Sequence, residues 1–421
     1  MEQFIASSIK MNGKMTIVFS AIAAGIMLAA GCDNSIEEWS GGNGNSVGKP
    51  DGNEEEVVPP VSKDKWSALA DSCTFVLTDS FLDKSKGTFW STPHDIDKSS
   101  GNIYWQQAHA LDVLIAAYER VKDKDKELAA EYEGYFSKWY ENDANNYNNS
   151  HESEGVYGGF FNSWTDDMAW ICLTLLRLSE ATGIEKYADT SRDIFDIYIW
   201  PRATEDARGT GLPWTDRDQN KNNKNACTNS PSCLVAAKLY VKYGKKAYLE
   251  AAKKLYDFSI AIMPDSERVE EPPLTYTQGT FGEACRQLYH ITGEKFYMDK
   301  AVEVIKYAFT GSRCVDASTG VLRHEGTNMD QSIFKAVLIP YAVNLVLDES
   351  ADKASRKVIR EKLMLCAETL DAHLDRNLYP QMYCNYFWGE NFREGTASMG
   401  AQASGASLAE GVARMVSSIK E

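Results

Sequence analysis

The chain has 421 residues, of which 43% are hydrophobic and 11% aromatic, so it is long enough for one large domain or two ordinary ones around a packed core. Its 60 acidic residues outnumber its 44 basic ones, and the resulting net charge of −16 argues against a nucleic-acid partner, because a phosphate backbone requires a basic face. The acidic balance otherwise bears on solubility and not on the fold.

The N-terminus has the features of an export signal. Lys10 and Lys14 precede an apolar run over residues 16–30 that is too short to span a membrane comfortably. Small residues then lead into Cys32, as in a bacterial lipoprotein signal, and the acidic residues that follow resemble a signal for the cell surface: Asp33, Glu37 and Glu38. We therefore expect residues 1–32 to be a signal peptide, with Cys32 lipidated, in an outer-membrane or cell-surface lipoprotein of a Gram-negative bacterium. The alternative is an ordinary signal peptide with an incidental cysteine.

Residues 33–63 are rich in glycine, asparagine, glutamate and proline. Such a segment cannot bury enough apolar surface to fold, so it is predicted to be a flexible tether. No comparable linker interrupts residues 64–421, which are predicted to form a single domain.

Helical periodicity runs through this domain, and alternating strand patterns are scarce. Twelve helices are expected, near residues 64–84, 104–121, 126–142, 164–182, 185–199, 225–243, 245–263, 277–292, 294–310, 331–348, 355–374 and 402–418. Three links between them share one spacing of leucine, glycine and tyrosine: Leu178, Gly183, Tyr187; Leu239, Gly244, Tyr248; and Leu288, Gly293, Tyr297. The glycine suits a left-handed helix C-cap, so the repeating unit is a helix hairpin with a tight turn.

The links between the expected helices alternate in length. Short links follow the second, fourth, sixth, eighth and tenth helices, and long links precede those helices and the twelfth. Antiparallel hairpins therefore place every long loop at one end of the domain. Six such hairpins closed in a ring make an all-α fold, the (α/α)6 barrel, with an open helical solenoid or two separate bundles as alternatives.

The long-loop end is rich in aromatic and polar residues. It carries six of the ten tryptophans: Trp90, Trp105, Trp164, Trp200, Trp214 and Trp388. Flat aromatic faces suit sugar rings, although tryptophans that only plug the barrel mouth would account for part of the set. Polar stretches open the helices that follow the long loops and are expected to converge on one cleft, at 105–109, 164–167, 224–229, 276–280, 330–335 and 402–404.

Asp166 and Asp167 are the sharpest feature of that cleft. Two carboxyl groups are the minimum equipment for glycoside hydrolysis, and neighbouring like charges push one pKa upward, which separates their roles. Adjacent residues in a helix point about 100° apart, which predicts carboxyl groups on the order of 5–6 Å apart and favours retention of configuration. The structural alternative is that Ser163 caps the helix and the two acids only interact favourably with its dipole.

Nothing in the sequence predicts a metal or a cofactor. The six histidines are scattered, without a metal-binding spacing. The stretch from Asp216 begins like a calcium loop but has Lys221 and Cys227 where glycine and glutamate are needed. Phosphate-binding and dinucleotide-binding motifs are absent from the sequence. The eight cysteines after Cys32 show no disulfide framework and are expected to be mostly buried thiols.

These residues resemble glycoside hydrolase family 76, the bacterial α-1,6-mannanases, over about residues 64–418. The strongest match is the sequence Asp-Asp-Met-Ala-Trp at 166–170, which opens a helix that ends before Gly183. Other segments similar to the family lie at 107–112, 224–229, 276–281 and 334–335.

The resemblance implies a catalytic (α/α)6 barrel that hydrolyses α-1,6-linked mannan backbones with retention, with Asp166 as nucleophile and Asp167 as acid/base. We expect an endo-acting monomer whose partners are α-mannan and, through the lipid anchor alone, a membrane. The expected substrate-binding residues are Trp105, His109, Trp164, Trp214, Asn225, Tyr276, Gln278, Lys335 and Trp388. The chain departs from the family at Pro340, where the family often has arginine, and a proline there predicts a bent helix.

Two other functions share these features. A non-catalytic glycan-binding lipoprotein would have the anchor and the tryptophan-rich mouth but would not need paired acids. A transglycosylase would pass the glycosyl group to another sugar, so that products lengthen instead of shortening.

Overall fold

The computed structural model describes residues 63–96, 103–143, 149–218, 220 and 222–419. The predicted signal peptide, the lipidation site and all but the last residue of the predicted tether lie outside these residues. In the described part of the chain, no helix is long and apolar enough to cross a membrane.

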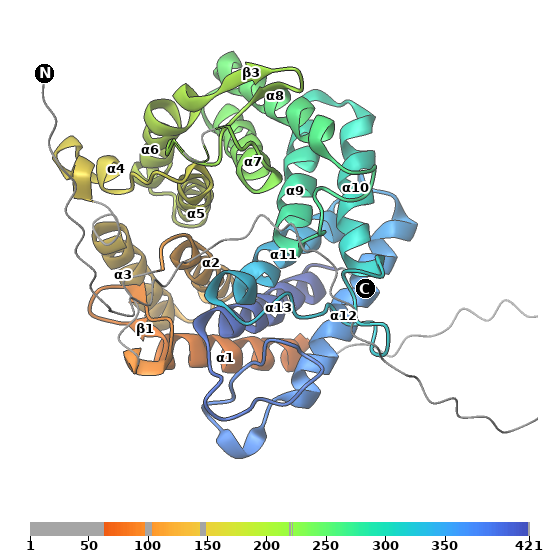
Figure 1. The fold of residues 1–421 in the computed structure, drawn as a ribbon. Helices are drawn as coiled ribbons and strands as arrows, with labels where there is room; N and C mark the ends of the chain where they lie inside the picture. The colour runs from red at the N-terminus through yellow and green to blue at the C-terminus, as the bar shows by residue number, and fades with distance from the viewer. Residues whose placement is uncertain (1–62, 97–102, 144–148, 219, 221, 420–421) are drawn as a thin grey trace, which may run out of the picture. The chain divides into compact units, whose positions relative to one another are not determined.

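Six helices form an inner ring in which each one packs against the next, and α13 closes the ring by packing against α2 (Figure 1). The inner helices are α2 (Trp105–Val121), α5 (Thr165–Thr182), α7 (Ala226–Tyr243), α9 (Thr275–Thr292), α11 (Met329–Leu347) and α13 (Met399–Ser418). A second helix backs each of them from outside: α3 (Lys126–Asp143), α6 (Glu185–Ile194), α8 (Lys246–Ile262), α10 (Lys295–Thr310), α12 (Lys353–His373) and α1 (Lys63–Ser80). The predicted all-α, (α/α)6 barrel is therefore confirmed, and the sixth hairpin pairs the last helix with the first.

Burial explains which helices are inner. The inner helix α13 is buried along most of its length and consists largely of small residues, whereas the outer helix α8 buries only one face. Small residues permit close helix approach, as at Gly279 of α9, where an added Cβ would lie 2.8 Å from the Cα of Leu338 in α11. The interior of the ring is therefore filled by closely packed helices.

The tight turns follow the predicted glycine pattern. Gly183, Gly244 and Gly293 end α5, α7 and α9 with φ values of 74°, 69° and 74°, in the left-handed region that favours glycine. These turns lie at the C-terminal ends of the inner helices, and the long links lead into their N-terminal ends. The long links carry a short helix and two small hairpins: α4 (Val156–Gly159), β1 (Leu82–Asp83) with β2 (Thr88–Phe89), and β3 (Thr204–Asp206) with β4 (Gly209–Gly211).

Two expected helices end earlier than predicted. The helix expected over 64–84 stops at Ser80, and the following residues form the β1–β2 hairpin. The helix expected over 185–199 stops at Ile194 and continues as a π-helical turn, Phe195–Ile199. Pro201 follows closely, and a proline cannot donate the backbone hydrogen bond that would continue a helix.

Pro340 lies inside α11, and the helix continues on both sides of it. A proline leaves the carbonyl group four residues earlier without its helical donor. In this chain the hydroxyl group of Ser407, on α13, donates to the Ala336 carbonyl oxygen at 3.0 Å. The neighbouring inner helix therefore supplies the hydrogen bond that the proline removes.

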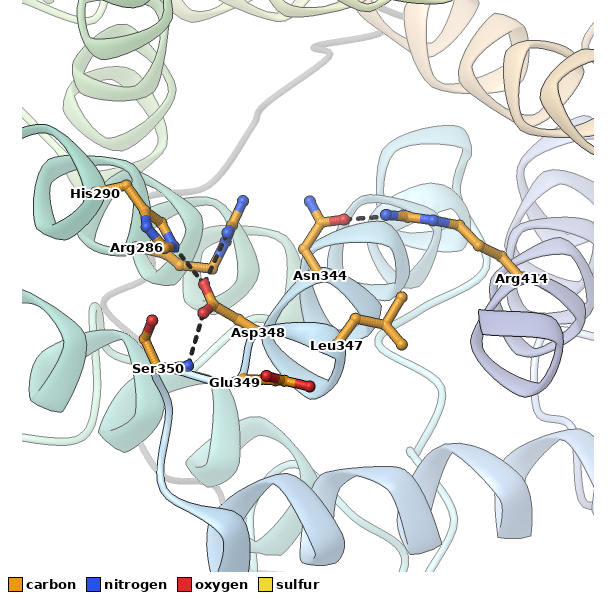
Figure 2. Close-up of a pocket in the computed structure, with 8 residues that line it drawn as sticks. All are labelled: Arg286, His290, Asn344, Leu347, Asp348, Glu349, Ser350 and Arg414. Carbon is orange, nitrogen blue, oxygen red and sulfur yellow. Dashed lines mark hydrogen bonds and ion pairs between the residues drawn. The ribbon is translucent and has the colours of Figure 1, made fainter. Parts of the chain in front are cut away.

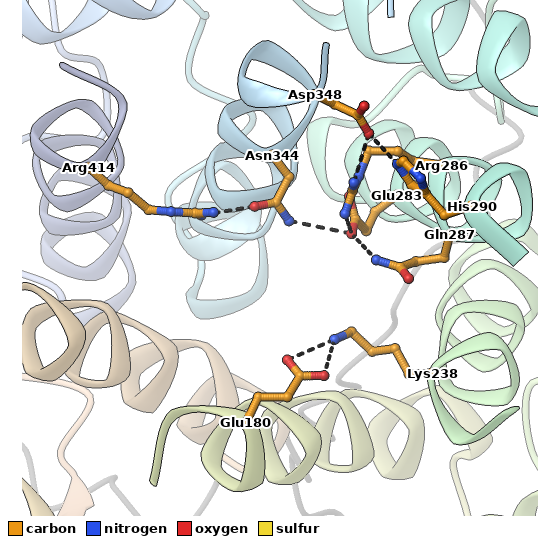
Figure 3. A network of polar contacts seen from close by, with 9 residues as sticks. All are labelled: Glu180, Lys238, Glu283, Arg286, Gln287, His290, Asn344, Asp348 and Arg414. Atoms are coloured by element: carbon orange, nitrogen blue, oxygen red, sulfur yellow. Dashed lines mark hydrogen bonds and ion pairs between the residues drawn. The ribbon is translucent and has the colours of Figure 1, made fainter. Parts of the chain in front are cut away.

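The short-turn end of the barrel contains a pocket of about 440 Å³ at the C-terminal ends of α9 and α11 (Figure 2). Beside it, Glu283 is 1% exposed and its carboxylate accepts hydrogen bonds from Arg286, Gln287 and Asn344 (Figure 3). Arg286 also donates to Asp348 at 2.9 Å. Charged and amide groups thus tie α9 to α11 at this end of the ring.

Candidate active site

Asp166 and Asp167 lie in the first turn of α5, at the end of the barrel that carries the long loops. The residue that precedes the helix is Trp164, and no side chain caps the helix there. The structural alternative, in which Ser163 caps this helix, is therefore wrong, because the helix starts one residue later than that cap requires. Asp166 is the second residue of α5 and Asp167 the third.

Both side-chain donors to the Asp166 carboxylate bind the same oxygen. Its Oδ2 accepts a hydrogen bond from the Trp214 indole Nε1 at 3.0 Å and another from the Cys227 Sγ at 3.4 Å. Its Oδ1 is buried and has no hydrogen-bond partner among the described residues. Burial raises the pKa of Asp166 to about 7, against the opposing effect of these donors.

Asp167 lies in a more negatively charged environment than Asp166 does. Its Oδ2 accepts a hydrogen bond from the Asn162 Nδ2 at 2.8 Å. Burial and the negative charges of Asp166 and Asp330 raise the pKa of Asp167 well above its ordinary value. Asp166 is therefore the group that ionises first, and Asp167 is the one that keeps its proton to higher pH.

The link before α7 is fastened to the start of α5. The Thr165 backbone nitrogen donates to the Trp214 carbonyl oxygen at 2.8 Å, and Trp214 in turn donates to the Asn223 carbonyl oxygen at 2.7 Å. The indole rings of Trp164 and Trp214 pack together with their centroids 4.5 Å apart. These contacts fix the Trp214 side chain beside Asp166 and leave both rings half-buried.

Aromatic rings from four inner helices lie together near the acids. Tyr276 stacks on Phe334 at 4.1 Å between centroids, and Trp105 packs against Phe334 and Trp170. The Trp105 Nε1 donates to the Asp330 Oδ1 at 3.0 Å. Because the charge of Asp330 also acts on Asp167, this aromatic group borders the catalytic candidates.

His109 and Lys335 are more deeply placed than the sequence suggested. His109 is 2% exposed, its Nδ1 lies 3.2 Å from the Asp112 Oδ2, and burial lowers its pKa. Lys335 is also 2% exposed, and its Nζ donates to the Tyr386 carbonyl oxygen at 2.6 Å. Burial lowers the pKa of Lys335 to about 8.

The structure corrects the expectation that Gln278 and Trp388 line sugar subsites. Gln278 is fully buried, and its side-chain amide is occupied by backbone groups of Glu267, Val269 and Val304. Trp388 is fully buried too, with the Lys335 ammonium 4.1 Å from its ring centroid. Both side chains support the barrel, and neither presents a surface to a sugar.

Asn225 caps α7, and its side chain accepts from the Thr228 backbone nitrogen at 3.1 Å. The Asn225 side chain therefore forms this hydrogen bond with its own helix. Asn225 is half-buried at the long-loop end, as are the three tryptophans Trp105, Trp164 and Trp214.

Sequence reasoning missed three acidic or amide groups at this end. Asn162 contacts Asp167, as described above. Glu270 accepts from the Thr277 hydroxyl at 2.6 Å, and burial raises its pKa to about 7. Glu325 accepts from the Thr275 backbone nitrogen at 2.7 Å. All three lie in the long links, where neither periodicity nor a motif marks them.

Three solved structures that resemble this chain are sugar-active proteins. The α-1,6-mannanase of Salegentibacter sp. is 25% identical, with a TM-score of 0.69 and coverage of 83% of this chain and 99% of that one. An inactive variant of that enzyme, with two adjacent aspartates replaced by alanine, was solved in complex with α-1,6-mannotetrose; it is 24% identical, with the same TM-score and coverage. The family 76 mannosidase of Bacteroides thetaiotaomicron is 17% identical, with a TM-score of 0.61 and coverage of 84% and 98%.

The chain was also compared with curated proteins and with protein families. No curated protein matches the chain. Residues 66–418, which include the whole ring from the first turn of α1 to the end of α13, match glycosyl hydrolase family 76. The chain belongs to glycosyl hydrolase family 76.

Proposed function

We propose that this protein is a retaining glycoside hydrolase that cleaves α-1,6-mannosidic linkages within mannan backbones. The observation that carries the proposal is the pair Asp166 and Asp167, two neighbouring carboxyl groups with unequal environments at the long-loop end of the barrel, the first buried and the second half-buried. Family membership and the relative that binds an α-1,6-linked mannose oligosaccharide support the choice of substrate. That relative lacks activity when two adjacent aspartates are replaced, which supports the same roles for this pair.

The contacts of the pair suggest how the two steps proceed. The Asp166 carboxylate attacks the anomeric carbon while Asp167 gives its proton to the glycosidic oxygen, so the leaving sugar departs as a neutral alcohol. Asp167, now ionised, takes a proton from water, and the resulting nucleophile releases the sugar from Asp166. The charge of Asp166 disappears when the glycosyl-enzyme forms, which favours the ionised form of Asp167 that acts as the base in the second step.

The test is a product profile on debranched α-1,6-mannan. We expect new reducing ends from the outset and oligosaccharides of mixed length, as internal cleavage requires. NMR of the first-formed sugar should show the α-anomer. Release of mannose alone would show exo action instead of endo action. Products longer than the substrate would indicate transglycosylation. Binding of mannan without new reducing ends would indicate a non-catalytic glycan-binding lipoprotein.

We further propose that the protein is anchored through a lipid on Cys32 to the outer membrane or cell surface. The signal-like segment that ends at Cys32 and the polar stretch after it support this location. One acyl chain holds a protein only weakly, so the anchor is expected to carry at least two.

Replacing Cys32 with alanine should move the protein from the membrane fraction to the soluble fraction without changing its activity on soluble mannan. Fractionation followed by immunoblotting measures the shift, and Cys314→Ala, which lies far along the chain, serves as the control. If the Cys32→Ala protein stays in the membrane fraction, the anchor lies elsewhere.

A further inference from the structure

The second residues of three consecutive inner helices meet beside the catalytic candidates. These residues are Asp166 of α5, Cys227 of α7 and Tyr276 of α9. The Cys227 Sγ lies 3.4 Å from the Asp166 Oδ2, and the Tyr276 side chain acts on the pKa of the Cys227 thiol. The thiol hydrogen bond therefore links α7 to α5 beside the catalytic candidates.

Resting on the proposed function, we infer that Cys227 is a positioning residue that orients the Asp166 carboxylate for attack. The thiol group and the Trp214 indole both donate to the other oxygen, Oδ2. Two donors at one oxygen fix the plane of the carboxylate and leave Oδ1 buried and without a partner. The two donors therefore hold the orientation of the carboxylate before attack.

The surroundings of Cys227 keep it a donor. Burial and the negative charges of Asp166 and Glu270 raise the pKa of the Cys227 thiol well above its ordinary value. The sulfur therefore keeps its hydrogen at neutral pH, which excludes a thiolate nucleophile at this position. A retained S–H group can stabilise the ionised form of Asp166, and this effect lowers the pKa of that carboxyl.

Cys227 also differs from the other cysteines in its exposure. The remaining seven described cysteines are buried, and Cys227 alone among the eight is partly exposed. Cys233, on the same helix, is an instructive contrast, because its Sγ donates to the Ala252 carbonyl oxygen at 3.2 Å inside an α7–α8 hairpin. One helix thus presents one thiol to the packing between helices and another to the catalytic carboxylate.

The test compares Cys227→Ala, Cys227→Val and Cys227→Ser on α-1,6-mannan across a pH range. Loss of the donor in the alanine and valine variants should lower kcat about 5- to 20-fold with little change in KM, in line with the loss of one hydrogen bond to a charged group. Because the ionised form of Asp166 loses a donor, the acidic limb of the pH–rate profile should move to higher pH. Serine, which donates through its hydroxyl group, should restore both kcat and the limb.

Two controls separate positioning from packing. Cys233→Ala removes a buried thiol from the same helix and should reduce thermal stability without moving the acidic limb. Valine fills the space of the cysteine side chain, so the Cys227→Val variant provides the test if Cys227→Ala does not fold. An acidic limb that stays in place in both Cys227→Ala and Cys227→Val would overturn the inference, as would a serine variant no better than valine. A wild-type protein that leaves mannan uncut would instead refute the proposed function.

Discussion

Asp166→Asn and Asp167→Asn are each expected to fold and to lose at least about 10³-fold in kcat on α-1,6-mannan. The first variant removes the proposed nucleophile, and an amide cannot replace it. The second removes the proposed proton donor, and general acid–base catalysis alone contributes about 10²–10⁴-fold to a rate. Initial rates of reducing-end formation measure both losses, and circular dichroism verifies that the helical fold is intact.

The two variants should differ when the leaving group changes. A substrate whose leaving group needs no protonation, such as an activated aryl mannoside, should recover part of the first step in Asp167→Asn but none of it in Asp166→Asn. The same recovery in both variants would contradict the assignment of roles. Asn162→Ala is a matched comparison, because it removes the hydrogen bond to Asp167 and keeps both carboxyl groups.

The pH dependence of the wild-type rate follows from the same two groups. In the proposed mechanism, attack requires Asp166 to be ionised, so the rate should rise as the pH passes through about 7. Protonation of the leaving group requires Asp167 to keep its proton, and its pKa lies well above the ordinary value, so the rate should fall again at higher pH. The alkaline limb should disappear in Asp167→Asn when the activated substrate is used.

The sequence predicted the barrel because its information is local. The glycines at 183, 244 and 293 close tight turns wherever the surrounding helices go, and apolar periodicity identifies helices without knowledge of their neighbours. The short hairpins and the π-helical turn after Ile194 were not predicted. A short-range pattern of apolar residues does not indicate where the backbone hydrogen-bonding pattern changes.

The site was harder to predict than the fold. The second position of α5 is marked by a pair of acids, but the donors to Asp166 come from 48 and 61 residues away, and no spacing in the sequence relates them. Gln278 and Trp388 belong to residue types common in sugar subsites, yet both are fully buried. Residue type suggests what a side chain can bind, whereas the packing of neighbouring helices decides whether a ligand can reach it.

Glu283→Ala should be among the most destabilising single changes in the barrel, because it breaks a buried ion pair. Glu283 is 1% exposed and holds Arg286 by two hydrogen bonds of 2.8 Å (Figure 3). Removing one partner of a buried pair costs about 3–5 kcal/mol, and because Arg286 keeps its contact with Asp348 we expect a loss near the lower end of that range. Urea denaturation at neutral pH, followed by circular dichroism, measures the loss in free energy of unfolding.

Glu180→Ala is the matched control, because its carboxylate accepts from Lys238 at 2.7 Å but is more than half exposed. An exposed pair contributes about 0–1 kcal/mol, so the free energy of unfolding of this variant should be close to that of the wild type.

The difference in stability between wild type and Glu283→Ala should also depend on pH. Burial alone would raise the pKa of Glu283, but pairing with Arg286 holds it below its ordinary value. A carboxyl with a lowered folded pKa stabilises the protein above its unfolded pKa, near 4.3, and loses that contribution as pH falls through the folded value. The gap between wild type and Glu283→Ala should therefore narrow in acid, and equal losses for Glu283→Ala and Glu180→Ala at neutral pH would mean that the ring is held together without this ion pair.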